Sequence, residues 1–600
     1  MTAPTTATDP GAATLCDLFD HTVRNHPDAI ALSTADGTVS YTYAQYRAAA
    51  ADVAAALHAC GVRRGDVVAL MFENRPDFHI VDAAIMHLGA VSCSIYNTSP
   101  ARDIAYIIRT SGARIAVCEH QFVDRLREAA AQVTVVCIER DVEGTAALSD
   151  LPRTEGFDFD AAWRAVSPDD VLTLIYTSGT TGAPKPVELT HSSMAAEVLL
   201  AAEMLDFRVG DRVPSALPMA HAAQRWGTHY SGMAFGLHVV CIDDLGTLAS
   251  NLVAIQPEIW GTVPRILEKM VAAVQARLGA ETDPAKKRLA DAAIEVGQRY
   301  AAALQQTRAD GGEPPQALID ERQKVEPVLA AIRQAMGLAN VRWLMVGAAP
   351  TAPHIQSYLA GLGLEVVEVW GMSELCAVAT INPAGAQKFG TVGKPLREVQ
   401  ITLDDDGEIL VRGPIVMRGY RGEPAATAEA FTVDGRLRTG DLGHIDAEGY
   451  LSITGRKKEI IVNAAGKNIA PVKVEAAVKA ECPLIGSVVA IGDDRPYLTA
   501  LIVLDPDALS QFAAAAAIPA ERPEDLYDHD AVTAAVAQAV ERANTQLARV
   551  EQIKRYKVLP RFWYAAGAEL TPTLKVRRRV IAEKYRSDID ALYAAEGALL

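Results

Sequence analysis

Short apolar runs alternate with longer amphipathic stretches from Leu15 to about Val263. Clear examples of the apolar runs are VVALMF (67–72), IAVCEH (115–120), VTVVCIE (133–139) and VLTLIYT (171–177). Apolar runs separated by helical spacings are typical of βαβ units, in which a parallel sheet is buried on both faces. We therefore predict an α/β architecture for this part of the chain.

The pattern changes twice further along. From about 265 to 338 the composition is rich in Ala, Gln, Glu, Lys and Arg with almost no strand signal, which predicts a helical insertion interrupted near GGEPP (311–315). Strand-like runs return with VRWLMVG (341–347) and LEVVEVWG (364–371). ITLDDDGEILVRG (401–413) and GHIDAEGYLSITG (443–455) then have the form of β-hairpins.

These patterns predict a division into domains, which 600 residues require because one core cannot serve so long a chain. We expect a flexible tail over 1–14 and a large N-terminal domain over 15–454. Within that domain, a β-rich subdomain occupies about 391–454. A hinge over 455–458 then leads to a C-terminal domain over 459–600.

Charge and composition narrow the functional classes. The net charge of −17 argues against nucleic acid as the main partner, since a polyanion would be repelled at long range. The eight cysteines form no CxxC pair, so we expect reduced thiols, a cytoplasmic setting and no zinc site. The first 14 residues lack the features of a signal peptide, and no window approaches 18 uninterrupted apolar residues.

The segment YTSGTTGAPKPVELTH (176–191) carries the most distinctive chemistry. It follows an apolar strand and places four hydroxyl residues, two glycines and Lys185 within ten positions. Backbone N–H groups of a glycine-rich loop can converge on phosphate oxygens because no Cβ blocks the approach. The spacing differs from that of a Walker A motif, so we predict a different kind of phosphate-binding loop. A surface turn is the alternative if this loop is taken alone.

Further motifs follow in a fixed order: VGAAP (346–350), VWGMSE (369–374), RTGD (438–441), ITGRKKEIIVNAAGKNIAP (453–471) and LTPTLKVRRR (570–579). Together with YTSGTTGAPKP they resemble the adenylate-forming superfamily over about residues 15–595. LPMAHAAQR (217–225), the helical insertion after VPRILEKM (263–270) and the ending LTPTLK are most similar to long-chain fatty acyl-CoA synthetases.

The resemblance implies a fold and a reaction. The fold would be a large N-terminal domain of αβαβα-type sheets with a β-rich subdomain, followed by a small mobile α+β domain. The reaction would join a fatty acid to CoA in two steps: ATP converts the acid to acyl-AMP with release of pyrophosphate, and the CoA thiol then displaces AMP. Both reactants of the first step are anions, so the site needs cations, Mg²⁺ and hydrogen-bond donors.

The resemblance also assigns residues to the nucleotide. Thr180 and Glu374 would hold Mg²⁺, Trp370 would stack on adenine, Asp441 would bind the ribose hydroxyls, and Arg456 would reach ribose or phosphate. The further ATP- and AMP-binding candidates are Thr177, Ser178, Gly179, Thr181, Gly182, Lys185, Ala348, Ala349, Gly371, Met372 and Ser373. Taken alone, Glu374 reads as a surface carboxylate and Trp370 as a core aromatic residue.

Lys575 matches the catalytic lysine of the family and would bridge the acyl carboxylate and the α-phosphate. Its alternative is one more cation in a basic helix. Lys458 matches the hinge residue about which the C-terminal domain rotates between the half-reactions. That rotation would bring the loop Ala465, Gly466 and Lys467 toward CoA.

For the acyl chain, the resemblance points to His221, Gln224, Arg225 and Trp226, with apolar residues of 226–239 forming a channel. His221 has a buried structural histidine as its alternative. Chain length cannot be read from these residues.

The chain departs from the family pattern at Pro186, where glycine is usual, and at Ala465, a frequent glycine. Proline fixes φ and removes an N–H, so the loop exit is altered. Three other readings stay open: an acyl carrier protein as the acceptor, a non-catalytic fatty-acid-binding or uptake protein, and a luciferase-like oxygenase. Any membrane contact would be weak and peripheral, at the inner face.

Overall fold

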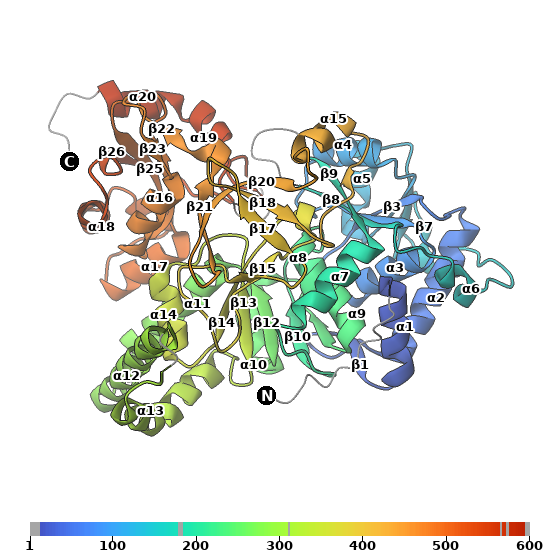
Figure 1. Cartoon of the computed structure of the whole chain (residues 1–600), viewed down its shortest axis with the longest axis horizontal. Coiled ribbons are helices and arrows are strands. Elements are labelled where there is room, and N and C mark those ends of the chain that lie inside the picture. The colour runs from blue at the N-terminus through green and yellow to red at the C-terminus, as the bar shows by residue number, and fades with distance from the viewer. Residues whose placement is uncertain (1–12, 178–183, 310–311, 565–566, 572–574, 595–600) are drawn as a thin grey trace.

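The computed structural model describes residues 13–177, 184–309, 312–564, 567–571 and 575–594. The tail predicted over 1–14 lies almost entirely outside these ranges. Figure 1 shows the chain as one large body with the C-terminal segments, in orange and red, set on one side of it. No described helix is both long and apolar enough to cross a membrane.

The largest sheet has eight strands in the order β19-β9-β8-β4-β3-β5-β6-β7. The four apolar runs form β3, β5, β6 and β8, so these strand predictions are confirmed. The strands are parallel from β8 through β7, whereas β9 pairs antiparallel with β8 and with β19. Their bounds are β3 Val67–Met71, β4 Val91–Ser94, β5 Ile115–Cys118, β6 Thr134–Cys137, β7 Ala146–Ala147, β8 Val171–Tyr176, β9 Pro186–Thr190 and β19 Gly419–Tyr420.

Helices flank this sheet, as βαβ connections require. Thr14, Thr42 and Thr190 each accept a backbone N–H at a helix start as part of a capping box, which fixes where α1, α2 and α7 begin. The helices are α1 Leu15–Asn25, α2 Tyr43–Ala59, α3 Pro76–His87, α4 Ala101–Ser111, α5 Val123–Ala129, α6 Phe159–Arg164 and α7 His191–Ala201.

Two further sheets complete the α/β part. One has the order β10-β11-β1-β2 and the other β12-β13-β14-β15-β16. Their strands are β1 Ile30–Thr34, β2 Ser40–Thr42, β10 Arg212–Ser215, β11 His238–Cys241, β12 Ile259–Thr262, β13 Trp343–Val346, β14 Val366–Trp370, β15 Thr380–Ile381 and β16 Lys394–Pro395. The helices beside them are α8 Ala222–Gln224, a π-helix Arg225–Tyr230, α9 Ser231–Phe235, α10 Leu248–Ile255 and α14 Pro353–Gly361.

Three helices occupy the interval between β12 and β13: α11 Pro264–Gly279, α12 Pro284–Ala309 and α13 Gln316–Ala335. Figure 1 shows α12 and α13 side by side, projecting from the body. A close approach fixes α12 against α14, since a Cβ at Gly297 would lie 2.0 Å from the carbonyl oxygen of Gly361.

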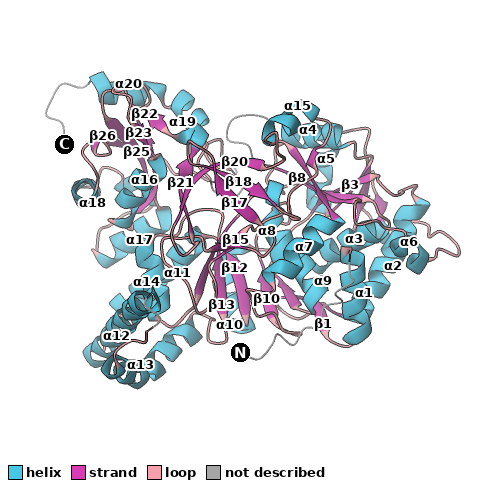
Figure 2. Cartoon of the chain, in the orientation of Figure 1, coloured by secondary structure: helices cyan, strands magenta, loops and turns pink. Residues whose placement is uncertain are grey.

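The two predicted hairpins are confirmed in a four-stranded sheet of order β17-β18-β20-β21, which Figure 2 shows in magenta at the centre of the molecule. β17 pairs antiparallel with β18, and β20 with β21. The bounds are β17 Gln400–Leu403, β18 Glu408–Arg412, α15 Pro424–Ala430, β20 Leu437–Ile445 and β21 Leu451–Arg456.

The C-terminal part has its own α+β organisation and its own core. Its sheets have the orders β22-β23 and β24-β25-β26. The strands are β22 Ile461–Val462, β23 Asn468–Ile469, β24 Ile485–Ile491, β25 Leu498–Leu504 and β26 Ile553–Val558. The helices are α16 Pro471–Ala480, α17 Pro506–Ala515, α18 Asp530–Gln546, α19 Arg578–Lys584 and α20 Arg586–Ala594.

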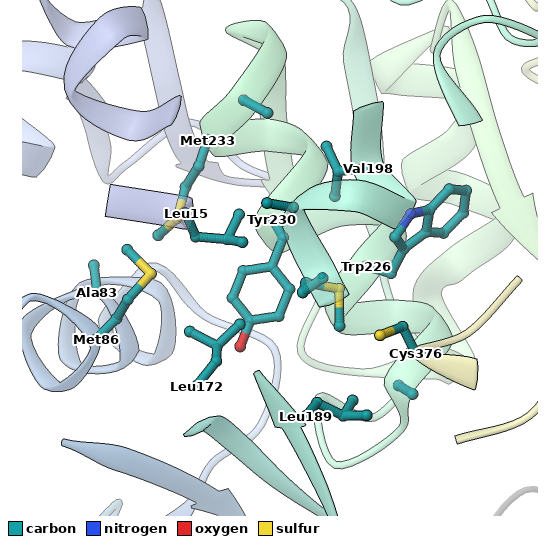
Figure 3. Packing of buried hydrophobic residues seen from close by; sticks show 14 of the residues in the cluster. Leu15, Ala83, Met86, Leu172, Leu189, Val198, Trp226, Tyr230, Met233 and Cys376 are labelled. Atoms are coloured by element: carbon teal, nitrogen blue, oxygen red, sulfur yellow. The ribbon is translucent and has the colours of Figure 1, made fainter. Parts of the chain in front are cut away.

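The main core joins segments far apart in the sequence. Figure 3 shows Tyr230 in the middle of this cluster, with Leu15 and Met86 on one side of it and Trp226 and Cys376 on the other. Trp226 and Tyr230 are almost completely buried, and large aromatic side chains supply much of the hydrophobic stabilisation of such a core. This core therefore includes the predicted acyl-pocket residue Trp226 and also Cys376, which follows the predicted metal ligand Glu374 by two residues.

Candidate active site

Three strands bring together Trp370, Asp441 and Arg456. Trp370 ends β14, and Asp441 on β20 lies opposite Arg456 on β21 in the antiparallel register. The Trp370 Nε1–H donates to Asp441 Oδ2 at 2.9 Å, and Arg456 Nε lies 2.9 Å from Asp441 Oδ1. Burial raises the pKa of the Asp441 carboxyl, and Arg456 opposes that rise. The carboxylate is thus held by two partners from different segments.

Lys575 approaches this cluster from the C-terminal part. Its backbone N–H donates to Thr571 Oγ1 at 3.0 Å, and Thr571 N–H donates back to the Lys575 carbonyl at 2.8 Å. Burial lowers the pKa of the Lys575 ammonium and nearby Arg456 lowers it further, while Asp441 and other carboxylates oppose the change. The structure therefore places this cation, which comes from the other end of the chain, in the electrostatic field of the Asp441 cluster.

Glu374 follows β14 in the short 3₁₀ helix Ser373–Leu375. It is buried, and its Oε1 accepts from the hydroxyl of Tyr420 at 2.9 Å. The Lys185 Nζ sits 4.6 Å from the centre of the Tyr420 ring, a cation–π geometry. Burial raises the pKa of Glu374, while Tyr420, Arg456 and Lys185 oppose the rise.

Tyr420 is a residue that the motif comparison missed. It lies on β19, which pairs with β9 directly after the glycine-rich loop, so its hydroxyl reaches Glu374 while its ring faces Lys185. The signal was present as a short apolar-aromatic run, IVMRGY (415–420), but nothing in that run indicates which sheet it joins. Only the pairing of β19 with β9 brings it to the site.

The described ends of the glycine-rich loop are held together. Thr177 N–H donates to the Lys185 carbonyl at 3.1 Å, and Lys185 N–H donates to Thr177 Oγ1 at 3.4 Å. Pro186 is the first residue of β9, a position at which strands accept proline, and its carbonyl accepts the Arg421 N–H at 2.9 Å. The predicted residues Ser178, Gly179, Thr180, Thr181 and Gly182 lie outside the described residues.

The segments that follow β13 and β14 are tightly fitted. A Cβ at Gly347 would lie 2.8 Å from a methyl group of Val369, so glycine lets the VGAAP segment pass close to β14. Ala348 has a φ of 71° and is exposed beside Ala349. Gly371, Met372 and Ser373 are partly exposed between Trp370 and Glu374. Their assignment to an adenine site stays a prediction.

The predicted acyl residues have a different environment. His221 caps α8, and burial with nearby Lys575 lowers its pKa to about 4, so its imidazole is neutral at pH 7. Gln224 donates to Ser215 Oγ at 3.0 Å, and Trp226 packs in the main core. A small cavity beside these residues is lined by Leu70, Phe72, Phe78, Ser94, Ile95, Tyr96, Asn97, Pro218, Met219 and Ala220.

Arg225 is completely buried in a polar network rather than directed into that cavity. Its guanidinium pairs with Asp82, and it donates to Ser92, Ser94 and Tyr230. His229 Nε2 lies 2.7 Å from the second oxygen of Asp82. The pKa of Asp82 is held well below its usual value by Arg225 and His229, which outweigh the effect of burial. The network joins the π-helix to α3 and β4.

The remaining predicted residues lie at the surface. Lys458 is exposed within the short 3₁₀ helix Lys457–Glu459, and Ala465, Gly466 and Lys467 are exposed between β22 and β23. The loop is shaped by Asn463, whose side-chain oxygen accepts the N–H groups of Ala465 and Lys467. The structure does not bring these residues to the Asp441 cluster.

One cluster of three carboxylates and the single carboxylate Glu374 are candidate ligands for a metal ion among the described residues. Asp404, Asp406 and Glu408 offer oxygens within 4.8 Å of one another, but Lys457 and Arg438 already pair with them. Glu374 instead makes no ion pair among the described residues and is desolvated. A hard divalent cation beside its free oxygen would offset that desolvation, so its chemistry fits Mg²⁺.

The chain matches two family descriptions in succession. Residues 19–421 match the family described as AMP-binding enzyme, and residues 458–597 match the AMP-binding enzyme C-terminal domain. A protein of Mycobacterium tuberculosis named as a fatty-acid–CoA ligase, fadD11, is 45% identical over 76% of this chain and 79% of its own length. The long-chain-fatty-acid–CoA ligase FadD15 of Mycobacterium bovis is 34% identical over 96% of both chains.

Solved structures agree with the fold. The adenylation domain of a carboxylate reductase from Mycobacterium chelonae gives a TM-score of 0.73 at 21% identity, covering 98% of this chain and 92% of its own. O-succinylbenzoate CoA synthetase of Bacillus subtilis, solved with ATP and magnesium ion, gives 0.66 at 21% identity, covering 94% and 98%. The predicted fold class is confirmed, and the chain belongs to the AMP-binding enzyme family, the adenylate-forming superfamily that its motifs resemble.

Proposed function

We propose that this protein is an AMP-forming fatty acid–CoA ligase that acts on long-chain acids through an acyl-AMP intermediate. The two mycobacterial relatives are named for fatty-acid–CoA ligation, and one of them spans nearly the whole chain. The observation that carries the proposal is the gathering of Trp370, Asp441, Arg456 and Lys575, of which the first and the last are 205 residues apart in the sequence. This is the residue set that the first half-reaction needs.

In the first half-reaction, a carboxylate oxygen of the fatty acid attacks the α-phosphorus of ATP. An O–P bond forms, the bond to the β-phosphate breaks, and pyrophosphate leaves. Trp370 stacks on adenine and Asp441 accepts hydrogen bonds from the ribose hydroxyls. Lys575 and Arg456 supply positive charge where the two anions meet, and a buried setting strengthens that effect.

Glu374, together with Thr180, would hold Mg²⁺, and the ion when bound neutralises charge on the β- and γ-phosphates. Tyr420 keeps one oxygen of Glu374 in a fixed direction and leaves the other free. Lys185, held over the Tyr420 ring, faces the same phosphates as a point charge. The glycine-rich loop would supply backbone N–H groups to the phosphate oxygens.

In the second half-reaction, the thiol of CoA attacks the acyl carbonyl carbon. A C–S bond forms, the C–O bond to AMP breaks, and the thiol proton is released. The burial of Lys575 beside Asp441 supports an arrangement suited to the first step. Rotation at Lys458 would then withdraw Lys575 and bring the loop Ala465–Lys467 toward the acyl-AMP.

Mass spectrometry of products tests this proposal directly. Purified protein is incubated with ATP, Mg²⁺, CoA and a mixture of short to long fatty acids. Acyl-CoA with a long-chain profile is the expected product. Accumulation of acyl-AMP alone would identify an acyl carrier protein as the acceptor, and the absence of both products would favour the fatty-acid-binding alternative.

A further inference from the structure

A strained turn follows Glu374 directly. Cys376 has a φ of 63° and a ψ of −62°, and the Ala377 N–H donates to the Leu375 carbonyl at 2.8 Å across it. This is the geometry of a γ-turn of the rare, strained form. A non-glycine residue keeps such a conformation only when its surroundings hold it there.

Glu197 on α7 provides that support. Its side chain is completely buried, and its carboxyl group accepts a hydrogen bond from the backbone N–H of Val378. Burial raises the pKa of this carboxyl well above its usual range, and nearby backbone N–H groups only partly oppose the rise. Glu197 therefore serves as a buried backbone acceptor for the residue that follows the turn by two positions.

The same turn also belongs to the main hydrophobic core. Cys376 belongs to the main hydrophobic core, and Figure 3 shows it beside Leu189 and Trp226. The second oxygen of Glu197 has no hydrogen-bond partner among the described residues. A buried acid with one unpartnered oxygen costs stability, so its presence needs a reason beyond packing.

The turn has little freedom to move without moving Glu374. A Cβ at Gly371 would lie 2.1 Å from the Ala377 carbonyl oxygen, so these two backbones are in direct contact. Met417 N–H donates to the Glu374 carbonyl at 2.9 Å, and Ala379 N–H donates to the Trp370 carbonyl at 2.8 Å. A shift of residues 376–378 would therefore be passed to both ends of the WGMSE segment.

We propose that Glu197 is a positioning residue of the nucleotide site, which fixes Glu374 by holding the strained Cys376 turn. Glu197 touches no substrate and acts only through the backbone of residues 375–378. The inference rests on the proposed role of Glu374 beside the phosphates of ATP. It assigns a purpose to a buried acid that lies outside the motifs quoted for the nucleotide site.

The test compares Glu197→Leu with Glu197→Gln. Glutamine keeps a carbonyl oxygen for the Val378 N–H, whereas leucine fills the volume without an acceptor and leaves that donor unsatisfied. We expect Glu197→Leu to weaken binding of a non-hydrolysable ATP analogue with Mg²⁺ about 10-fold, with the KM for fatty acid unchanged. Glu197→Gln should stay within about 2-fold of the wild type.

Hydrogen exchange supplies a readout that does not depend on activity. Amides of residues 374–378 should exchange faster in Glu197→Leu than in Glu197→Gln, while the strands of the large sheet keep their protection. The matched control is Glu119→Leu, which removes a buried acid that accepts the Glu73 N–H at 2.6 Å elsewhere. That control should leave exchange at 374–378 at the wild-type rate.

Equal impairment of the glutamine and leucine variants would overturn the proposal, as would wild-type exchange at 374–378 in Glu197→Leu. If the leucine variant does not fold, Glu197→Asp takes its place, since one methylene less withdraws the acceptor from the turn. A wild-type protein that makes no acyl-AMP would refute the proposed function. The exchange difference between the leucine and glutamine variants would still decide whether Glu197 holds the turn.

Discussion

The two sides of the candidate site hold buried charges in opposite ways. On the nucleotide side, Asp441, Arg456 and Lys575 come from separate segments and meet around a common point. On the acyl side, Arg225 is completely buried, and its two terminal nitrogens already contact Asp82, two serines and Tyr230 within the protein. The first arrangement leaves charge to be used by a ligand, whereas the second uses its charge to fix the fold. Buried charge alone therefore does not identify a binding residue.

The strongest test of this contrast removes the acyl-side cation. Arg225→Met should lower the free energy of unfolding by about 3–5 kcal/mol, because it leaves Asp82 buried without its principal partner. Urea unfolding measures the change. Binding of the ATP analogue at a temperature where the variant is folded should stay close to the wild-type value.

The paired change sharpens the result. Asp82→Leu combined with Arg225→Met should recover part of the lost stability, since neither partner then leaves the other unpaired. Arg579→Met is the surface control, because Arg579 is exposed on α19 and pairs only with Glu583 among the described residues. A stable Arg225→Met protein with a greatly raised KM for fatty acid would reverse the assignment and place Arg225 in the acyl site.

The corresponding change on the nucleotide side is Lys575→Ala. It should slow acyl-AMP formation by about 10²–10³-fold with little loss of stability, because the site loses a cation where charge develops. Pyrophosphate release measures this step. Transfer of a supplied acyl-AMP to CoA should be nearly unaffected, and a comparable loss in both half-reactions would contradict the assigned role.

The pH dependence gives an independent check on Lys575. Since its pKa is lowered by burial, the ammonium loses its proton, and the adenylation rate falls, at a lower pH than for an exposed lysine. Lys575→Arg should remove this alkaline decline, because a guanidinium stays charged throughout the range. Persistence of the same decline in Lys575→Arg would assign the titration to another group.

The sequence predicted the segments that carry motifs better than the residues and strand pairings that hold those segments in place. The apolar runs of β3, β5, β6 and β8 are read directly, because strands buried on both faces are continuously apolar. The pairing of β19 with β9 could not be read, since paired residues 231 and 233 positions apart leave no local pattern. The roles assigned to individual site residues stay predictions.

Tyr420 and Glu197 illustrate what was missed. Each lies outside the motif residues assigned to the nucleotide and contributes through a neighbour that β19 or α7 brings close. Arg225 shows the converse, because a motif position marked it for the acyl pocket while the structure gives it four partners within the protein. The local sequence shows which chemical groups are present. The tertiary contacts decide which of those groups remain available to a ligand.

A moderate effect is expected from Tyr420→Phe. The change removes the hydroxyl that fixes Glu374 while keeping the ring beneath Lys185, so the affinity for Mg²⁺ and ATP should fall about 10-fold, as for loss of a hydrogen bond to a charged group. Equilibrium dialysis with the ATP analogue measures it. Tyr450→Phe is the control, since its hydroxyl donates to the Ala386 carbonyl instead.

The smallest effect concerns the contact between α11 and the C-terminal part. Arg265 pairs with Asp505, and Lys479 Nζ lies 2.8 Å from Glu268, in the same structure that buries Lys575. Under the proposed rotation at Lys458, these pairs would form in one arrangement and break in the other. Glu268→Gln should therefore shift the balance from adenylation toward thioester formation by about 2–5-fold, the range of partly exposed ion pairs.

Rates of the two half-reactions, measured separately, give this balance. Raising the salt concentration should shift the wild-type protein in the same direction and the Glu268→Gln variant less, because screening weakens the same contact. Glu321→Gln removes a pair within the insertion, between Arg299 on α12 and Glu321 on α13, and should leave the ratio unchanged. An equal response of both variants to salt would show that α11 does not hold the C-terminal part, and that the burial of Lys575 depends on the site residues themselves.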